Sequence, residues 1–176
     1  YTNVGELVDR IDDKILDNYF RNHWQGEMAK YKYSGPALIG EVNALKPRKV
    51  LDIGCGYHEF KGKIDNLIGI DPYNSNADIE VKLLDYYPTE KFDATLALGS
   101  INFGSTDKIF AELEHAVSLC NPGALMFFRA NPGLPHDVEP DRTGGRHSQW
   151  ISFYPWDSNF IVNCADQLGV DILDIR

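Results

Sequence analysis

The sequence has 176 residues, 43% of them hydrophobic and 24% charged, which is typical of one globular domain with a sizeable core. Its formal charge of −9 argues against a general nucleic-acid binder, because phosphate contacts of Lys and Arg supply most non-specific affinity. No apolar run approaches the roughly 18 residues that a membrane span needs. Three scattered cysteines without a CxxC pair predict neither a disulfide framework nor a metal site. We therefore expect a cytoplasmic protein without membrane partners. The first residue, Tyr1, indicates a trimmed or partial chain.

An amphipathic helix is predicted over residues 4–20. Apolar residues recur there at helical spacing, with aspartates largely between them. The helix packs either on the fold or a second copy, or folds over a bound ligand. A second helix is predicted from Ser34-Gly35-Pro36 to Lys46-Pro47, since proline suits the first helical position.

Strands then alternate with helices along the rest of the chain. Apolar runs predict strands over 49–54 and 67–71, with a brief helix over 58–65 between them and a loop after Pro72. Further strands are predicted over 79–84, 92–98 and 124–130, and Ser105 or Thr106 is expected to cap a helix between the last two. A short strand over 151–154, a helix from Asp157 or Ser158 to Gly169, and a sixth strand over 170–175 complete the chain. This alternation predicts an α/β fold, with a mostly parallel sheet and helices on both faces.

The turn after the first strand has the features of a ligand-binding turn. Gly54 and Gly56 have no Cβ, so the backbone can turn sharply and approach a ligand closely. A dinucleotide site needs a third glycine where this chain has Glu59. Asp52 would repel a pyrophosphate and attract an ammonium or sulfonium group. The turn therefore predicts a ligand that carries positive charge.

The sequence resembles the class I S-adenosylmethionine-dependent methyltransferases at five places, in order and at the usual spacing: Asp52-Ile-Gly-Cys-Gly56, Asp71, Asp85, Phe92-Asp93 and Asn121-Pro-Gly-Ala124. The resemblance implies a Rossmann-like fold with short or missing helices after strands 1 and 2. Residues 1–47 would form an N-terminal helical cap, and residues 48–176 the cofactor-binding core of a single domain. It implies S-adenosylmethionine as cofactor and S-adenosylhomocysteine as product. His58 departs from the family, which commonly has a third glycine there. A seventh strand, which the family pairs with the sixth, is not visible.

The resemblance also implies roles for individual residues. Asp52, Gly54 and Gly56 would cradle the methionine part of the cofactor. Asp71 would accept hydrogen bonds from both ribose hydroxyls. Asp85 would hold the adenine amino group, and Tyr86 would lie against the ring. The predicted cofactor-binding residues are Asp52, Gly54, Cys55, Gly56, Asp71, Pro72, Asp85, Tyr86, Gly99 and Ser100.

Candidates for catalysis and substrate binding cluster after the fourth and fifth strands. A loop rich in proline and glycine over residues 131–150 is expected above the methyl-acceptor site. A general base is needed only if the acceptor must lose a proton, and the candidates for this or for orienting the acceptor are Asn102, His136 and His147. The alternative is that Asn102 is a turn residue and that the two histidines are merely exposed. Arg129, Arg142 and Arg146 either bind a carboxylate or phosphate of the substrate or form surface ion pairs.

The predicted activity is methyl transfer from S-adenosylmethionine to a small molecule by in-line displacement. The residues Ser100-Ile-Asn-Phe103 differ from the Asp or Asn followed by Pro-Pro-Tyr or Phe of nucleic-acid amino-group methyltransferases. That difference disfavours a nucleic-acid partner. The alternatives are a nucleic-acid or protein methyltransferase, a non-catalytic cofactor-binding or interaction domain, and, less favoured, an NAD(P)-dependent oxidoreductase. The expected assembly is a monomer or a homodimer.

Overall fold

In the part of the chain that the structure describes, four strands form a parallel sheet. The computed structural model describes residues 4–22, 35–103, 106–130 and 156–176. The strands are β1 (Val50–Ile53), β2 (Leu67–Ile70), β3 (Phe92–Leu98) and β4 (Cys120–Arg129), and their order in the sheet is β2-β1-β3-β4. All three pairings are parallel, which confirms the predicted α/β class. The strand order reverses between β1 and β3, the place where open α/β sheets bind ligands at the carboxyl ends of their strands.

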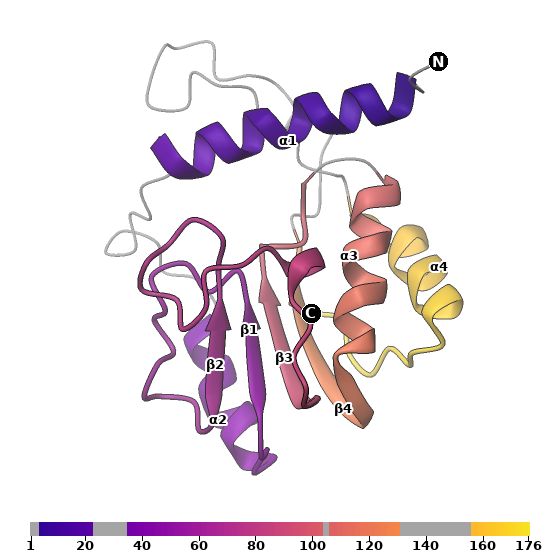
Figure 1. Cartoon of the computed structure of the whole chain (residues 1–176). Helices are drawn as coiled ribbons and strands as arrows, with labels where there is room; N and C mark the ends of the chain where they lie inside the picture. The colour runs from indigo at the N-terminus through magenta and orange to yellow at the C-terminus, as the bar shows by residue number, and fades with distance from the viewer. Residues whose placement is uncertain (1–3, 23–34, 104–105, 131–155) are drawn as a thin grey trace.

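Helices cover both faces of the sheet, because the buried strand residues alternate between two cores. The helices are α1 (Val4–Asn22), α2 (Leu38–Ala44), α3 (Thr106–Ser118) and α4 (Ser158–Leu168), with 3₁₀ turns η1 (Gly35–Ala37) and η2 (Leu83–Asp85). Val50 packs with Val42 of α2 on one face. Leu51 and Ile53 pack with residues of α3 and α4 on the other. Figure 1 shows α1 lying across the carboxyl ends of the strands.

Several predicted helices are confirmed. The predicted helix over 4–20 is α1, and the second predicted helix is η1 followed by α2. Helix α4 begins after Asp157, whose Oδ1 accepts a hydrogen bond from the Phe160 N–H at 2.7 Å, and ends at Gly169 in the left-handed conformation (φ 65°). Among the described residues, no helix combines the length and apolar character needed to cross a membrane.

The predicted helix over 58–65 is wrong, because this segment is a series of turns. Positive φ values occur within it at His58 (61°) and Gly62 (75°) and directly after it at Asn66 (56°), and a right-handed helix cannot continue through such residues. Asn43 of α2 anchors the turns instead, through its Nδ2 to the Lys63 carbonyl and its Oδ1 to the Asp65 N–H.

Two predicted strands do not form. Over 79–84, only Ile79 makes an isolated parallel bridge, to Ile70, and η2 follows. The chain leaves the sheet there, and Val81 and Leu83 turn towards a cavity instead. Residues 170–175 are exposed and form no strand, since none of the described strands pairs with them; Arg176 contacts Glu41 of α2. The predicted loop over 131–150 and the predicted strand over 151–154 lie outside the described residues.

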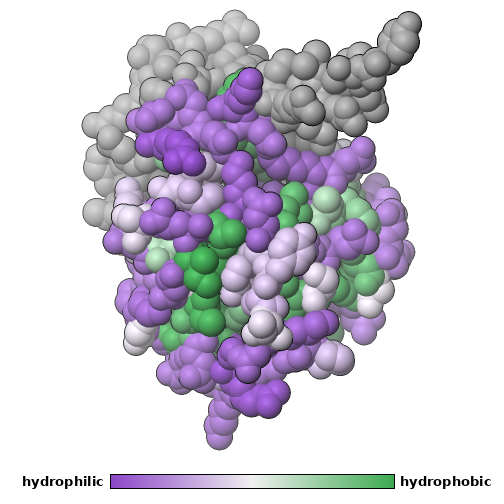
Figure 2. Space-filling model, viewed as in Figure 1, coloured by the Kyte–Doolittle hydropathy of each residue, from purple (hydrophilic) through white to green (hydrophobic). Residues whose placement is uncertain are grey.

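Strand β4 extends beyond its predicted start at residue 124. Cys120 pairs with Phe92, but the next partners are Leu125 and Ala94, so the Asn121-Pro-Gly-Ala124 segment bulges out of the ladder. Gly123 has a φ of 78° there, a conformation that glycine adopts without steric cost. Figure 2 shows that hydrophobic side chains reach the surface across the middle of the face in view, whereas hydrophilic residues predominate above it.

Candidate functional site

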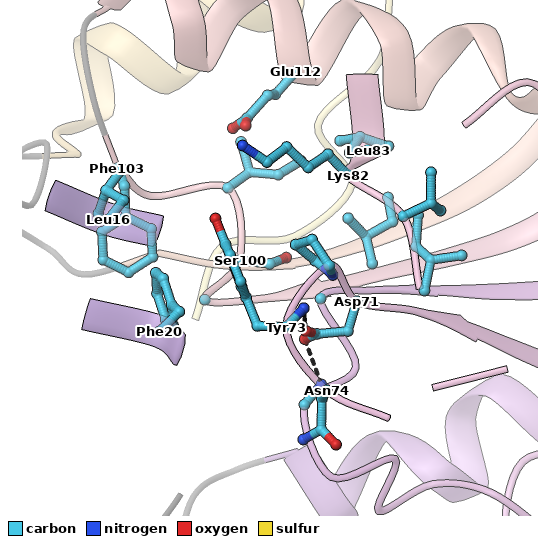
Figure 3. Close-up of a pocket in the computed structure, with 18 of the residues that line it drawn as sticks. Leu16, Phe20, Asp71, Tyr73, Asn74, Lys82, Leu83, Ser100, Phe103 and Glu112 are labelled. Atoms are coloured by element: carbon cyan, nitrogen blue, oxygen red, sulfur yellow. Dashed lines mark hydrogen bonds between the residues drawn. The ribbon is translucent and has the colours of Figure 1, made fainter. Parts of the chain in front are cut away.

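A cavity of about 530 Å³ lies at the carboxyl edge of the sheet, under α1. Its volume is in the range of small-molecule and cofactor sites. The residues after β1, β2 and β3 form its floor, and Leu16 and Phe20 of α1 contribute to the roof (Figure 3). The cavity therefore occupies the position predicted for the ligand.

The glycine turn after β1 is tightly constrained. Gly54 has a φ of 68°, and a Cβ on it would lie 2.3 Å from the Cβ of Ser100 at the end of β3. A side chain at this position would clash and would require an unfavourable backbone conformation. Gly56 also has a positive φ, of 55°. The two glycines thus bring bare backbone to the edge of the cavity.

Asp71 organises the loops after β1 and β2. Its Oδ2 accepts the Gly56 N–H at 3.0 Å and its Oδ1 the Tyr73 N–H at 2.8 Å, and it also receives a hydrogen bond from the Asn74 backbone (Figure 3). Burial nevertheless raises the pKa of this carboxyl above its ordinary value. Two carboxylate oxygens offer about four acceptor positions, so capacity remains for a ligand hydroxyl.

His58 stands where the resembled family commonly has glycine, and its backbone has the left-handed conformation that glycine favours (φ 61°). The buried ring of His58 packs on Gly69 of β2. A Cβ added to Gly69 would lie 2.4 Å from Cε1 of the ring. Its Nε2 lies 2.7 Å from Oδ2 of Asp78, which also accepts the Gly69 N–H. The pair therefore links the turns after β1 to the loop after β2.

Polar contacts hold α1 over the cavity. Lys108 of α3 pairs with Asp13, and the hydroxyl of Tyr73 donates to Asp17. Lys82 Nζ lies 3.1 Å from Oδ1 of Asp17. Phe20 stacks on the Tyr73 ring, with centroids 5.3 Å apart. The roof is thus attached to three separate segments of the core.

Of the ten predicted cofactor-binding residues, six line the cavity: Gly54, Gly56, Asp71, Pro72, Gly99 and Ser100. The Oγ of Ser100 is buried without a hydrogen-bond partner, which suits it to a ligand contact. These six residues come from three strand ends, and the parallel sheet brings them together.

The other four predicted residues do not line the cavity. Asp52 is buried within β1, and strand alternation turns it to the opposite face from Ile53, which does line the cavity. Burial, and then the charge of Asp71, raises the pKa of Asp52 to about 7. Cys55 lies beside Gly69, and burial raises its thiol pKa to about 12. The turn η2 leaves Asp85 exposed and places Tyr86 in the core against Phe92.

The structure places two of the catalytic and substrate candidates. Asn102 is buried after β3, and its Oδ1 has no hydrogen-bond partner; it does not line the cavity. Arg129 is exposed at the carboxyl end of β4, in register with Leu98 of β3. The other candidates, His136, His147, Arg142 and Arg146, lie outside the described residues.

Sequence reasoning missed several residues around the cavity. Tyr73, Lys82 and Glu112 line the cavity. From the sequence, Tyr73 is expected in a polar loop, Lys82 in a strand, and Glu112 on the solvent side of a helix. Glu112 follows Lys108 by one helical turn, the only local signal that both share a face of α3. Within the described residues, no group of three or more His, Cys, Asp or Glu is arranged to hold a metal ion.

The fold is Rossmann-like, and solved structures of methyltransferases share it. The structure of a DhpI complex with S-adenosylhomocysteine has a TM-score of 0.63 to this chain at 18% identity, covering 95% of this chain and 89% of that one. A 1,6-didemethyltoxoflavin N1-methyltransferase from Burkholderia thailandensis scores 0.59 at 12% identity, covering 96% and 80%. An O-methyltransferase family protein from the same organism scores 0.54 at 16% identity, covering 91% and 54%. Neither a protein-family model nor a curated protein matches the sequence. The likeness establishes the fold, and the resemblance found in the sequence is confirmed at that level.

Proposed function

We propose that the protein is an S-adenosylmethionine-dependent methyltransferase that acts on a small molecule. The observation that carries the proposal is the convergence of the Gly54–Gly56 turn, the Asp71 carboxylate and the Ser100 hydroxyl on one cavity beneath α1. Structures of DhpI, which share this fold, are complexes with S-adenosylhomocysteine or S-adenosylmethionine, and this supports the choice of cofactor.

The chain's own residues fit the cofactor. The bare backbone at Gly54 and Gly56 would hold the methionine part, and Asp71 would accept a hydrogen bond from a ribose hydroxyl, because its oxygens retain acceptor capacity for one. Bound S-adenosylmethionine supplies a methyl group activated by its sulfonium charge. What remains for the protein is to align the acceptor and exclude water, and good alignment is worth about 7–11 kcal/mol.

An oxidoreductase using NAD(P) fits the structure less well. A dinucleotide site places the pyrophosphate at the N-terminus of the helix that follows the glycine turn. In this protein turns, and not a helix, follow Gly56. The described residues after β1 therefore provide no helix N-terminus for a pyrophosphate. A non-catalytic binding domain is the other competitor, and turnover of an acceptor separates it from an enzyme.

For the acceptor, we propose a small anionic molecule. Arg129 lies at the carboxyl end of β4, on the same edge of the sheet as Ser100, where an arginine can pair with a carboxylate or phosphate. Arg142 and Arg146 are the further candidates from the sequence. Screening acceptors with and without an anionic group tests this proposal, and Arg129→Ala should raise the KM of the true acceptor more than it lowers kcat.

Calorimetric titration with S-adenosylmethionine, S-adenosylhomocysteine and NAD tests the cofactor assignment. We expect the two adenosyl compounds to bind and NAD to show no saturable binding. Asp71→Ala should weaken S-adenosylhomocysteine by about 1.5–3 kcal/mol, the scale of hydrogen bonds to a charged group. Asp166→Ala, at an exposed position of α4, is the matched control. Unchanged affinity in a folded Asp71→Ala variant would remove the ribose assignment.

A further inference from the structure

The cavity has apolar as well as polar walls. Ile70, Val81, Leu83 and Ile101 are among the residues that line it, and so is Glu112 of α3, whose carboxyl lies beside Lys82 (Figure 3). These apolar residues and Glu112, which we call the slot, suit a flat, largely apolar ring whose polar edge faces the carboxyl group. If the ribose lies at Asp71, as the proposed function has it, the ring in this slot is the adenine.

The side chain of Glu112 is partly buried beside the cavity. The Lys82 ammonium and the Glu112 carboxyl point towards each other (Figure 3), and Lys108 lies one helical turn away. Both lysines already pair with carboxylates of α1, Lys108 with Asp13 and Lys82 with Asp17. Burial outweighs their attraction and, with the charge of Asp13, raises the pKa of Glu112 to about 7. Burial of this carboxyl is unfavourable for the ligand-free protein. A carboxyl whose pKa is shifted in this way beside a cavity indicates a ligand contact.

The residue that the resemblance assigns to the adenine amino group cannot reach this slot. Asp85 ends the turn η2 and points to solvent, while Leu83 of the same turn faces the cavity. Helix α3 packs on η2, and Glu112 of α3 lines the same cavity as Leu83. An acceptor for the amino group is therefore present, but it comes from a different element.

We propose that Glu112, in place of Asp85, accepts the hydrogen bond from the exocyclic amino group of the cofactor's adenine. This inference rests on the proposed function and makes Glu112 the residue that selects a 6-amino purine. An ionised carboxylate only accepts hydrogen bonds, so it binds the amino group and repels an oxygen at the same position. A protonated carboxyl also has a donor and tolerates either group. Selectivity should therefore increase as pH rises through about 7.

The test compares S-adenosylhomocysteine with its deaminated analogue, in which an oxygen replaces the amino group, by calorimetry at pH 6 and pH 8.5. For the wild type at pH 8.5, we expect the analogue to bind about 10–100-fold more weakly, the range of one hydrogen bond to a charged group. This ratio should shrink at pH 6. Glu112→Gln should bring it close to one at both pH values, because an amide can turn either its oxygen or its NH₂ to the base. Glu114→Gln, an exposed position on the same helix, should keep the wild-type ratio and pH dependence.

The outcomes separate this inference from the proposed function. If Glu112→Gln keeps the wild-type discrimination, or if Asp85→Asn abolishes it, the assignment to Glu112 is overturned while cofactor binding stands. If neither nucleoside binds the wild type, the proposed function fails and this inference fails with it. Because discrimination is a ratio within one protein, a uniform loss of affinity from local rearrangement does not imitate the expected result.

Discussion

At the scale of single residues, Asp78 shows how one carboxylate stabilises the loops that carry the site. Lys61, the Gly69 N–H and His58 surround it and lower its pKa to about 2, despite the opposing effect of burial. Because the folded pKa lies below the ordinary value, the stabilisation is present above about pH 4 and is lost as pH falls towards 2.

Asp78→Asn should therefore lower the free energy of unfolding by about 1 kcal/mol at pH 7, allowing for solvent screening of this partly exposed group. The cost should diminish at pH 3, because Asp78 of the unfolded wild-type chain is then largely protonated and the lowered folded pKa contributes less stability. Urea unfolding at the two pH values measures this, with Asp166→Asn as the exposed control. An equal cost at both pH values would show that the charge of Asp78 is not what matters.

Glu112 has the opposite dependence on pH. Its folded pKa of about 7 lies above the ordinary value, so the ligand-free protein loses stability as pH rises from about 4.5 to 7. Glu112→Gln removes that loss and should gain on the order of 2 kcal/mol relative to wild type between pH 5 and pH 8. Asp52, also raised to about 7, titrates in both proteins and cancels in the difference. Urea unfolding without ligand measures the effect, and a pH-independent difference would contradict it.

At the scale of elements, polar contacts join α1 to three segments of the core, beside apolar ones such as Phe20 on Tyr73. Asp13 pairs with Lys108, and Asp17 contacts both Lys82 and Tyr73. Exposed or partly exposed ion pairs contribute only about 0.2–1 kcal/mol each, so we expect α1 to detach at a lower free energy than the sheet unfolds once they are removed.

Asp13→Asn combined with Asp17→Asn should weaken S-adenosylhomocysteine several-fold and speed proteolytic cleavage between α1 and α2, with little change in the unfolding of the core. Salt near 1 M should have a similar effect on the wild type, since it screens the same pairs. Stopped-flow release of the ligand and limited proteolysis measure the two effects, with Asp171→Asn as the exposed control. Wild-type release rates in the double variant would contradict a closing role for α1.

At the scale of the whole molecule, the charge of −9 disfavours polynucleotide acceptors. We expect binding to tRNA or duplex DNA weaker than micromolar at physiological salt, because long-range repulsion opposes association, whereas an arginine such as Arg129 at the carboxyl edge of the sheet can still bind a single anionic group. Fluorescence anisotropy with labelled tRNA and duplex DNA measures this. Micromolar binding that is lost on Arg142→Ala with Arg146→Ala would instead place those arginines on a phosphate backbone.

The class of the fold and the position of the cavity could be predicted from the sequence alone. The apolar runs, the Gly54 and Gly56 turn, the Asp71 strand end and the Asp157 and Gly169 caps are local signals, because backbone sterics and strand or helix periodicity act over a few residues. The six predicted residues that line the cavity all sit at strand ends, which a parallel sheet necessarily brings to one edge.

Which side chains complete the site could be seen only in the tertiary structure. The contacts that close the cavity join residues far apart in the sequence, 56 positions for Asp17 and Tyr73 and 95 for Asp13 and Lys108, and no local pattern encodes such pairs. The path of residues 79–84 is likewise not encoded locally. These residues leave the sheet after the bridge at Ile79 and line the cavity, so that Asp85 faces solvent and Glu112 faces the slot. Local propensity favours a strand there, but contacts with distant elements determine the path of the chain.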